Sequence, residues 1–181
     1  PLRLHVAVPR LAYVVVPVAL TSGAALRLLW LWKGIGRARA LAAAGQAFER
    51  RVASTGWRVL VLGDSTGVGI GAGRPEESIA GLFAADHPDA DIVNVSRSGA
   101  RVGGALEQAR ECRRLGLRFD LALLHIGGND VLRATPLDRL VEDSRLLMAE
   151  LTAIAQHTLW LGPGDVGIAP LFPAPFSWLM R

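Results

Sequence analysis

The chain has 181 residues, of which 51% are hydrophobic and only 6% aromatic, and its formal net charge is +4. This length allows one hydrophobic core, and an aliphatic apolar fraction suits helices packed on a parallel sheet. The positive charge comes from arginines spread along the sequence, without the basic stripe and stacking aromatics of a nucleic-acid surface, so we expect no nucleic-acid partner. The single cysteine, Cys112, excludes an internal disulfide and forms no metal-binding pattern with the four histidines.

The N-terminal part is an apolar segment. Residues 11–32 contain one charged side chain, and at roughly 1.5 Å per residue such a helix would span about 33 Å, enough for a hydrocarbon core of about 30 Å. Trp30 and Trp32 beside Lys33 suit a membrane interface. We therefore expect residues 1–33 to form a hydrophobic helix that acts as a membrane anchor or signal-anchor. A signal sequence and a helix buried against the domain are the alternatives.

The flanking charges indicate the orientation only weakly. More basic residues follow the apolar segment than precede it, which favours a cytoplasmic domain, whereas secretion would reverse this, so the side of the membrane stays open. Residues 34–56 are rich in alanine and arginine and are expected to form a linker or broken helix without chemistry of its own.

Strands and helices are predicted to alternate in the remainder of the chain. The predicted strands are residues 59–62, 91–95, 119–126 and 158–161, and the predicted helices are residues 75–87, 104–115 and 135–154. Pro75 with two following glutamates indicates the start of the first helix. Glycine at every second position from Gly67 to Gly73 disfavours a helix between the first strand and Pro75. The last helix is expected to carry one apolar face, formed by Leu137, Leu140, Val141, Leu147, Met148, Leu151 and Ile154. Short connections between these elements predict an α/β fold with a parallel sheet covered on both faces.

Three of these strands end in residues suited to acyl transfer. The first ends in Gly63-Asp64-Ser65, the second is followed by a loop containing Gly99, and the third is followed by Gly-Gly-Asn129. Strands of a parallel sheet end at one edge, where open α/β sheets bind ligands. A serine hydroxyl there can act as a nucleophile, while the Ser65 and Gly99 amides and the Asn129 carboxamide can stabilise an oxyanion.

These three blocks, in this order, resemble the SGNH or GDSL-type esterase/lipase family over residues 57–178. The resemblance implies a flavodoxin-like three-layer αβα sandwich that hydrolyses carboxylic esters, with a small-molecule ester as substrate and no metal or organic cofactor. It makes Ser65 the nucleophile and places Gly99 and Asn129 in the oxyanion hole. Acyl and alcohol specificity and oligomeric state stay open.

The same family carries a general base and its orienting acid as Asp-x-x-His near the carboxyl end, and the sequence stops at Arg181 without that block. None of the histidines is expected to replace it: His5 lies in the N-terminal segment, His87 and His157 precede strands at the opposite edge, and His125 is expected to be a satisfied core residue. We therefore expect residues 57–181 to be a C-terminally incomplete hydrolase domain of low activity. The alternative is a non-catalytic, membrane-tethered binding domain.

Two further interpretations concern the glycines and the carboxylates. The pattern Gly67-x-Gly69-x-x-Ala72 matches a loosened dinucleotide-binding fingerprint, with Arg97 available for a 2′-phosphate, although the match is weak in a glycine-rich stretch. Asp64 and Asp130 are expected to cap or brace neighbouring backbone rather than to transfer protons. Asp165, after the fourth strand, is a lesser candidate for the cleft, and Trp160 and Trp178 are expected to pack.

Overall fold

The computed structural model describes residues 32–33, 36, 45–52 and 56–164. Contacts divide the chain into two units, residues 1–40 and 41–181, and the fold described below belongs to the second. Most of the predicted N-terminal helix, with nearly all of the segment 11–32, lies outside the described residues, as do Asp165 and Trp178. None of the described helices is long and apolar enough to cross a bilayer.

In the described part of the chain, four parallel strands form one sheet. They are β1 (Arg58–Gly63), β2 (Asp91–Asn94), β3 (Phe119–His125) and β4 (Ala155–Leu161), in the spatial order β2-β1-β3-β4. The chain leaves β1 for one neighbour and later returns to pair on its other side. The point between β1 and β3 is therefore the topological switch point, where open α/β sheets bind ligands.

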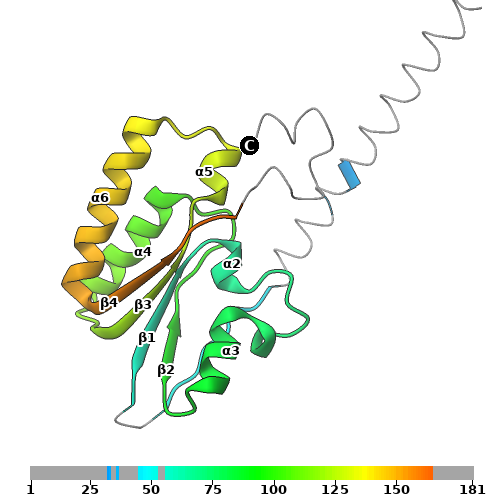
Figure 1. Ribbon diagram of the computed structural model, residues 1–181, viewed down its shortest axis with the longest axis vertical. Coiled ribbons are helices and arrows are strands. Elements are labelled where there is room, and N and C mark those ends of the chain that lie inside the picture. The colour runs from blue at the N-terminus through cyan, green and yellow to red at the C-terminus, as the bar shows by residue number, and fades with distance from the viewer. Residues whose placement is uncertain (1–31, 34–35, 37–44, 53–55, 165–181) are drawn as a thin grey trace, which may run out of the picture. The chain divides into compact units, whose positions relative to one another are not determined.

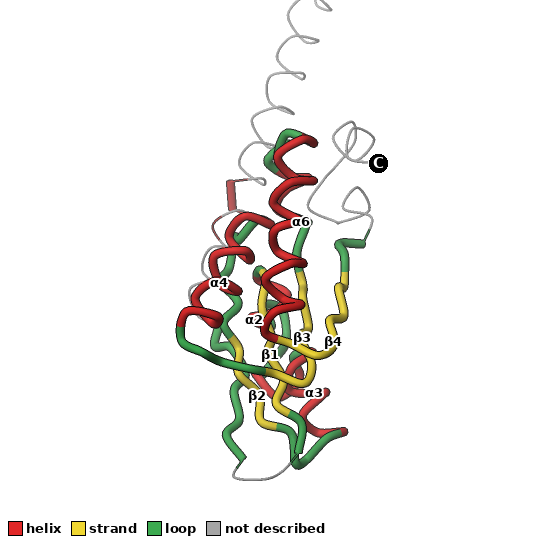
Figure 2. The backbone as a smooth tube through the Cα atoms, turned by 90° about the vertical axis from the view of Figure 1, so that its left-hand side faces the viewer, coloured by secondary structure: helices red, strands yellow, loops and turns green. Residues whose placement is uncertain are grey.

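Helices cover both faces of this sheet, as the sequence predicts. The helices are α2 (Ser65–Val68), α3 (Ile79–Asp86), α4 (Val102–Arg114), α5 (Gly128–Leu132) and α6 (Leu137–Ile154), with a 3-10 turn, η1, at Pro75–Glu77. In Figure 1, α4 and α6 lie on one side of the strands and α3 on the other, and Figure 2 shows α4 and α6 from their own side. The expected three-layer αβα architecture is confirmed.

The side chains of β1 point alternately to the two faces of the sheet and so contribute to two separate cores. Leu60 and Leu62 of β1 pack with α4 and α6, whereas Val59 and Val61 pack with α3, and all four are at most 1% exposed. Successive side chains of a strand point to opposite faces, so a strand buried on both faces must be apolar throughout. This explains why β1 reads as an unbroken aliphatic run up to Gly63.

The apolar face predicted for α6 is wider than the face that is buried. Leu147, Leu151 and Ile154 are buried, but Leu137 is 73% exposed and Val141 is 57% exposed. At about 100° per residue, Leu137 and Val141 lie roughly 70° and 110° from the centre of the buried trio. These two residues share the predicted apolar face but lie at its solvent side, so the sheet does not cover them.

The helix predicted to start at Pro75 begins later. Pro75 opens the η1 turn, and α3 starts at Ile79 with Ser78 as its N-cap, whose hydroxyl accepts a hydrogen bond from Gly81 N at 3.1 Å. Ser78 thus supplies the oxygen that an N-terminus needs, which the proline cannot provide.

The segment before β1 contacts the sheet through Arg50. Residues 45–49 form no helix, and the Arg50 backbone exchanges two hydrogen bonds with Ile92 of β2, at 3.1 and 2.7 Å. The Arg50 guanidinium donates to the carbonyls of Ala84, His87 and Ala90 around the end of α3. A cation at a helix C-terminus satisfies its last carbonyls. Part of the expected linker is therefore fixed to the folded unit.

Candidate active site

Ser65 is the first residue of α2, directly after the central strand. The Asp64 side chain caps this helix by accepting a hydrogen bond from Thr66 N at 2.9 Å, and Gly69 ends it with a φ of +89°. The expected bracing role of Asp64 is confirmed, and its cap explains why a helix forms although glycines follow. Ser65 is half-buried, and within the described residues no hydrogen bond engages its hydroxyl.

The glycines of the dinucleotide fingerprint do not open a helix. Gly67 lies inside α2, and Gly69 is its C-terminal cap in the left-handed region. A Rossmann fingerprint instead needs its glycines at the strand end, ahead of the helix that receives the pyrophosphate. The geometry of this turn therefore disagrees with the dinucleotide interpretation.

Hydrogen bonds join the three strand-end loops. Arg97 N, in the loop after β2, donates to Gly63 O at 3.0 Å, and Asn129 Nδ2 donates to Ala100 O in the same loop at 2.9 Å. The loop that contains Gly99 is thus tied both to the end of β1 and to the start of α5. These bonds bring the regions of Ser65, Gly99 and Asn129 together at one edge of the sheet.

Each of these three residues retains a donor. Within the described residues no acceptor is recorded for the backbone N–H of Ser65 or of Gly99, and the Asn129 carboxamide has a second N–H besides the one bonded to Ala100. Gly99 has a φ of +79°, a conformation that side chains other than glycine rarely adopt. The edge therefore offers unengaged donors of the kind that an oxyanion needs.

Asp130 braces the backbone at the start of α4. The carboxylate is 3% exposed and accepts hydrogen bonds from Val102 N, the first residue of α4, and from Thr135 Oγ1, each at 2.9 Å. A carboxylate at a helix N-terminus satisfies an otherwise unpaired amide. Asp130 therefore fixes α5, and Asn129 with it, to the start of α4.

Comparison with known proteins identifies the family. The model of the GDSL-like lipase/acylhydrolase family matches residues 61–181, which is more than half of the chain. The chain belongs to this SGNH/GDSL hydrolase family. No curated protein sequence matches it.

Three solved structures illustrate the similarity in fold. TesA is 24% identical with a TM-score of 0.53, and the match covers 68% of each chain. AlinE4, an SGNH-hydrolase family esterase, is 22% identical with a TM-score of 0.53 over 70% of this chain and 68% of its own. A lipolytic G-D-S-L family protein from Veillonella parvula is 12% identical with a TM-score of 0.51 over 68% and 67%. These likenesses establish the fold.

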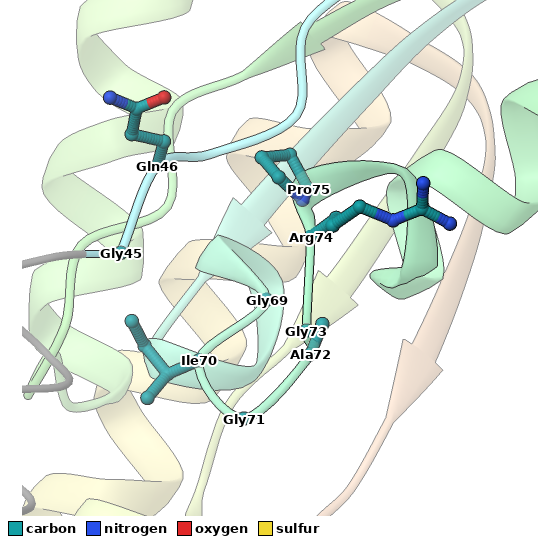
Figure 3. Close-up of a pocket in the computed structure, with 9 residues that line it drawn as sticks. All are labelled: Gly45, Gln46, Gly69, Ile70, Gly71, Ala72, Gly73, Arg74 and Pro75. Carbon is teal, nitrogen blue, oxygen red and sulfur yellow. The ribbon is translucent and has the colours of Figure 1, made fainter.

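Two hollows flank α2 in this family member. A small one of about 90 Å³ is lined by Asp64, Thr66, His125, Ile126, Gly128, Leu161, Gly162 and Pro163. A larger one of about 260 Å³ lies beyond the other end of the helix, where the loop Gly69–Pro75 faces Gly45 and Gln46 (Figure 3). Among the described residues that line the larger hollow, Arg74 is the one with a charged side chain, and it pairs with Glu77 at 2.9 Å. Glycine backbone and uncharged groups thus form most of its wall.

The described histidines fall into two classes. His87 caps the end of α3 before β2, and His157 lies in β4 opposite Leu121, so both lie toward the amino ends of the strands, as predicted. His157 is inside β4 rather than ahead of it, because the strand starts at Ala155.

Among the described residues no cluster of three or more His, Cys, Asp or Glu side chains could hold a metal ion.

His125 is a buried residue, but the prediction that it is satisfied is wrong. The side chain is 3% exposed, and its Nε2 has no hydrogen-bond partner within the described residues. Burial lowers the pKa of this imidazole below its ordinary value, and the nearby Asp64 carboxylate opposes that shift only in part. His125 is paired with Gly63 across the sheet, so this unsatisfied ring lies next to the strand end that leads to Ser65.

This burial predicts a pH-dependent stability. Below about pH 6.5 the unfolded chain protonates His125 while the folded chain resists it, so the free energy of unfolding should fall as pH drops through the ordinary imidazole pKa. We expect His125→Leu to reduce the difference between urea denaturation curves measured at about pH 7.5 and about pH 5.5. Leu124→Ala, at a buried neighbour, should lower the free energy of unfolding by about 2–5 kcal/mol at both pH values. The difference in this free energy between the two pH values should stay as in the wild type. If the free energy of unfolding of His125→Leu differs between the two pH values as much as that of the wild type, the prediction is contradicted.

Two buried polar residues near the site escaped the sequence interpretation. Asn94, at the end of β2, and Gln108, in α4, are 6% and 2% exposed. Gln108 lies three residues after Ala105 and four before Cys112, so it shares the buried face of α4. A polar residue on an apolar helix face is the sequence signal that could have identified it. Asn94 at a strand end has no such signal in the sequence.

Proposed function

We propose that this SGNH/GDSL family member hydrolyses carboxylic esters through Ser65. The observation that carries the proposal is the set of hydrogen bonds that join the three strand-end loops beside a half-buried serine hydroxyl with no partner among the described residues. The site lies at the switch point of the sheet, where a small molecule has access from outside the strand ends. The substrate class is a small-molecule carboxylic ester.

Ser65 acts as the nucleophile in this proposal. Its Oγ bonds to the carbonyl carbon of the ester, its proton passes to a base, and the alcohol leaves to give an acyl-enzyme that water hydrolyses. The negative charge that develops on the carbonyl oxygen is held by the Ser65 and Gly99 amides and the Asn129 carboxamide. Removing one such donor typically costs about 3 kcal/mol in the barrier.

The proton acceptor is not assigned among the described residues. The Asp64 carboxylate already accepts a hydrogen bond from Thr66, the Asp130 carboxylate is held by Val102 and Thr135, and His125 is buried beneath the turn. None of these three side chains is hydrogen-bonded to Ser65. The proposal therefore covers the nucleophile and the three donors.

Membrane association through residues 11–32 is a separate proposal from the sequence.

Covalent labelling tests the assignment without depending on turnover. A fluorophosphonate probe should add to the wild-type protein once, and mass spectrometry of the peptides should locate the adduct on Ser65. An excess of a short-chain nitrophenyl ester should slow the labelling, because probe and ester compete for one hydroxyl. An adduct on another serine, such as the exposed Ser98, contradicts the proposal. Ligand binding without any labelling favours the non-catalytic binding domain instead.

A further inference from the structure

Two buried carboxamides contact the backbone on both sides of Ser65. Gln108 reaches Gly63, two residues before the serine, and Asn94 reaches Gly67, two residues after it. Neither side chain is more than 6% exposed, and they come from different elements, α4 and β2. Both functional ends of each carboxamide are engaged, so each has one defined orientation.

Gln108 completes the hydrogen bonding at the end of β1. The last residue pair between β1 and β2 is Val61 with Asn94, and Gly63 lies beyond it. Gln108 Oε1 accepts from Gly63 N at 2.8 Å, and Gln108 Nε2 donates to Gly63 O at 3.0 Å. The side chain thus supplies the acceptor that a neighbouring strand would supply to Gly63 N, and it adds a second donor to Gly63 O, which also accepts from Arg97 N. Without it, the Gly63 N–H would be a buried, unpaired donor, which is costly.

Asn94 holds the other end of the turn. Its Nδ2 donates to Gly67 O at 2.9 Å, while its Oδ1 accepts from Ser96 N at 3.1 Å. Gly67 lies so close to the Ser96 side chain that a Cβ at this position would overlap with it. The loop after β2 therefore packs directly against α2, and Asn94 fixes the two together.

We infer that Gln108 and Asn94 are positioning residues. They hold the Gly63–Gly67 turn, and thereby the Ser65 hydroxyl, in a fixed position relative to Gly99 and Asn129. The inference rests on the proposed function for its effect on catalysis. A displacement of about 1 Å at a reacting group can cost about 100-fold in rate, so the turn has to be held from both sides. Gln108 and Asn94 touch neither substrate nor the reacting atoms in this inference, since they act through Ser65.

The test compares Gln108→Met with a packing control on the same helix. Methionine matches the length of glutamine and removes both bonds to Gly63. We expect kcat for a short-chain nitrophenyl ester to fall about 10- to 100-fold with KM within about twofold of the wild type. Deuterium exchange of the peptide spanning residues 62–69 should become several-fold faster, because its local opening is no longer opposed. Asn94→Leu, which cuts the other tie, should act in the same direction and serves if Gln108→Met does not fold.

Leu106→Ala separates positioning from general destabilisation. Leu106 is 3% exposed in α4 and packs in the core without a hydrogen bond to the turn. This control should lower the thermal midpoint yet keep kcat and the exchange of residues 62–69 close to wild type. An equal loss of kcat in Leu106→Ala, or unchanged exchange in both carboxamide variants, overturns the inference. If the wild type hydrolyses no ester, the proposed function fails, while the exchange measurement still decides whether the carboxamides hold the turn.

Discussion

Ser65→Ala is expected to reduce ester hydrolysis to the rate in buffer. Removing a serine nucleophile typically costs more than about 10³-fold, because no other group can form the acyl-enzyme. Initial rates with a short-chain nitrophenyl ester, compared at equal protein concentration, measure the effect. The fold should survive, since Ser65 is half-buried and the cap of α2 is supplied by Asp64 rather than by Ser65.

Ser98→Ala is the matched control for this substitution. Ser98 is an exposed serine in the loop after β2, next to Gly99, and it has no role in the proposed chemistry. Its replacement should leave the rate unchanged. If Ser65→Ala keeps the wild-type rate, or if Ser98→Ala loses it, the nucleophile has been assigned to the wrong residue.

Gly63→Ala is expected to be the most destabilising single substitution near the site. A Cβ at this position would overlap with the carbonyl oxygen of His125 on β3, and backbone atoms in a sheet cannot move aside cheaply. The residue also has a φ of +134°, which strains any side chain. We expect a loss of more than about 4 kcal/mol in the free energy of unfolding, or failure to fold, as judged by urea denaturation and by yield.

Gly116→Ala provides the comparison that isolates the overlap. Gly116 follows α4 with a φ of +69°, and nothing lies within 4 Å of the position that its Cβ would take. Only the backbone strain remains there, so we expect a loss of about 1–2 kcal/mol. Similar losses in the two variants would show that β1 and β3 approach each other less closely at Gly63 than the structure indicates.

Much of the site could be predicted because it depends on local sequence signals. Each of the three blocks follows a strand, and the parallel arrangement alone brings strand ends to one edge, so Ser65, Gly99 and Asn129 could be placed together from their spacing. The short helix α2 could not be predicted from its glycines, since the Asp64 cap outweighs their low helix propensity. That outcome depends on one side-chain hydrogen bond rather than on composition.

The remaining differences come from tertiary packing. The sequence shows that Gln108 lies on a buried helical face but not that Gly63 lies opposite it, because 45 residues separate the two. His125 reads as an ordinary core residue until its neighbours show that none of them, within the described residues, satisfies Nε2. Leu137 and Val141 share the period of the buried stripe, and only the position of the sheet decides which part of that stripe is covered.

The contacts of Arg50 bear on how this sheet can associate. A bare strand edge exposes unpaired amides that can template pairing with another chain. Here Ile92, in the middle of the four-residue strand β2, already gives both its backbone groups to Arg50, whose guanidinium binds the carbonyls around the end of α3. Ile92 therefore cannot pair with a strand of another chain while this bridge is in place. A substitution at Arg50 would remove the guanidinium bonds that hold this segment beside the end of α3, and with them the anchor of the residue that pairs with Ile92.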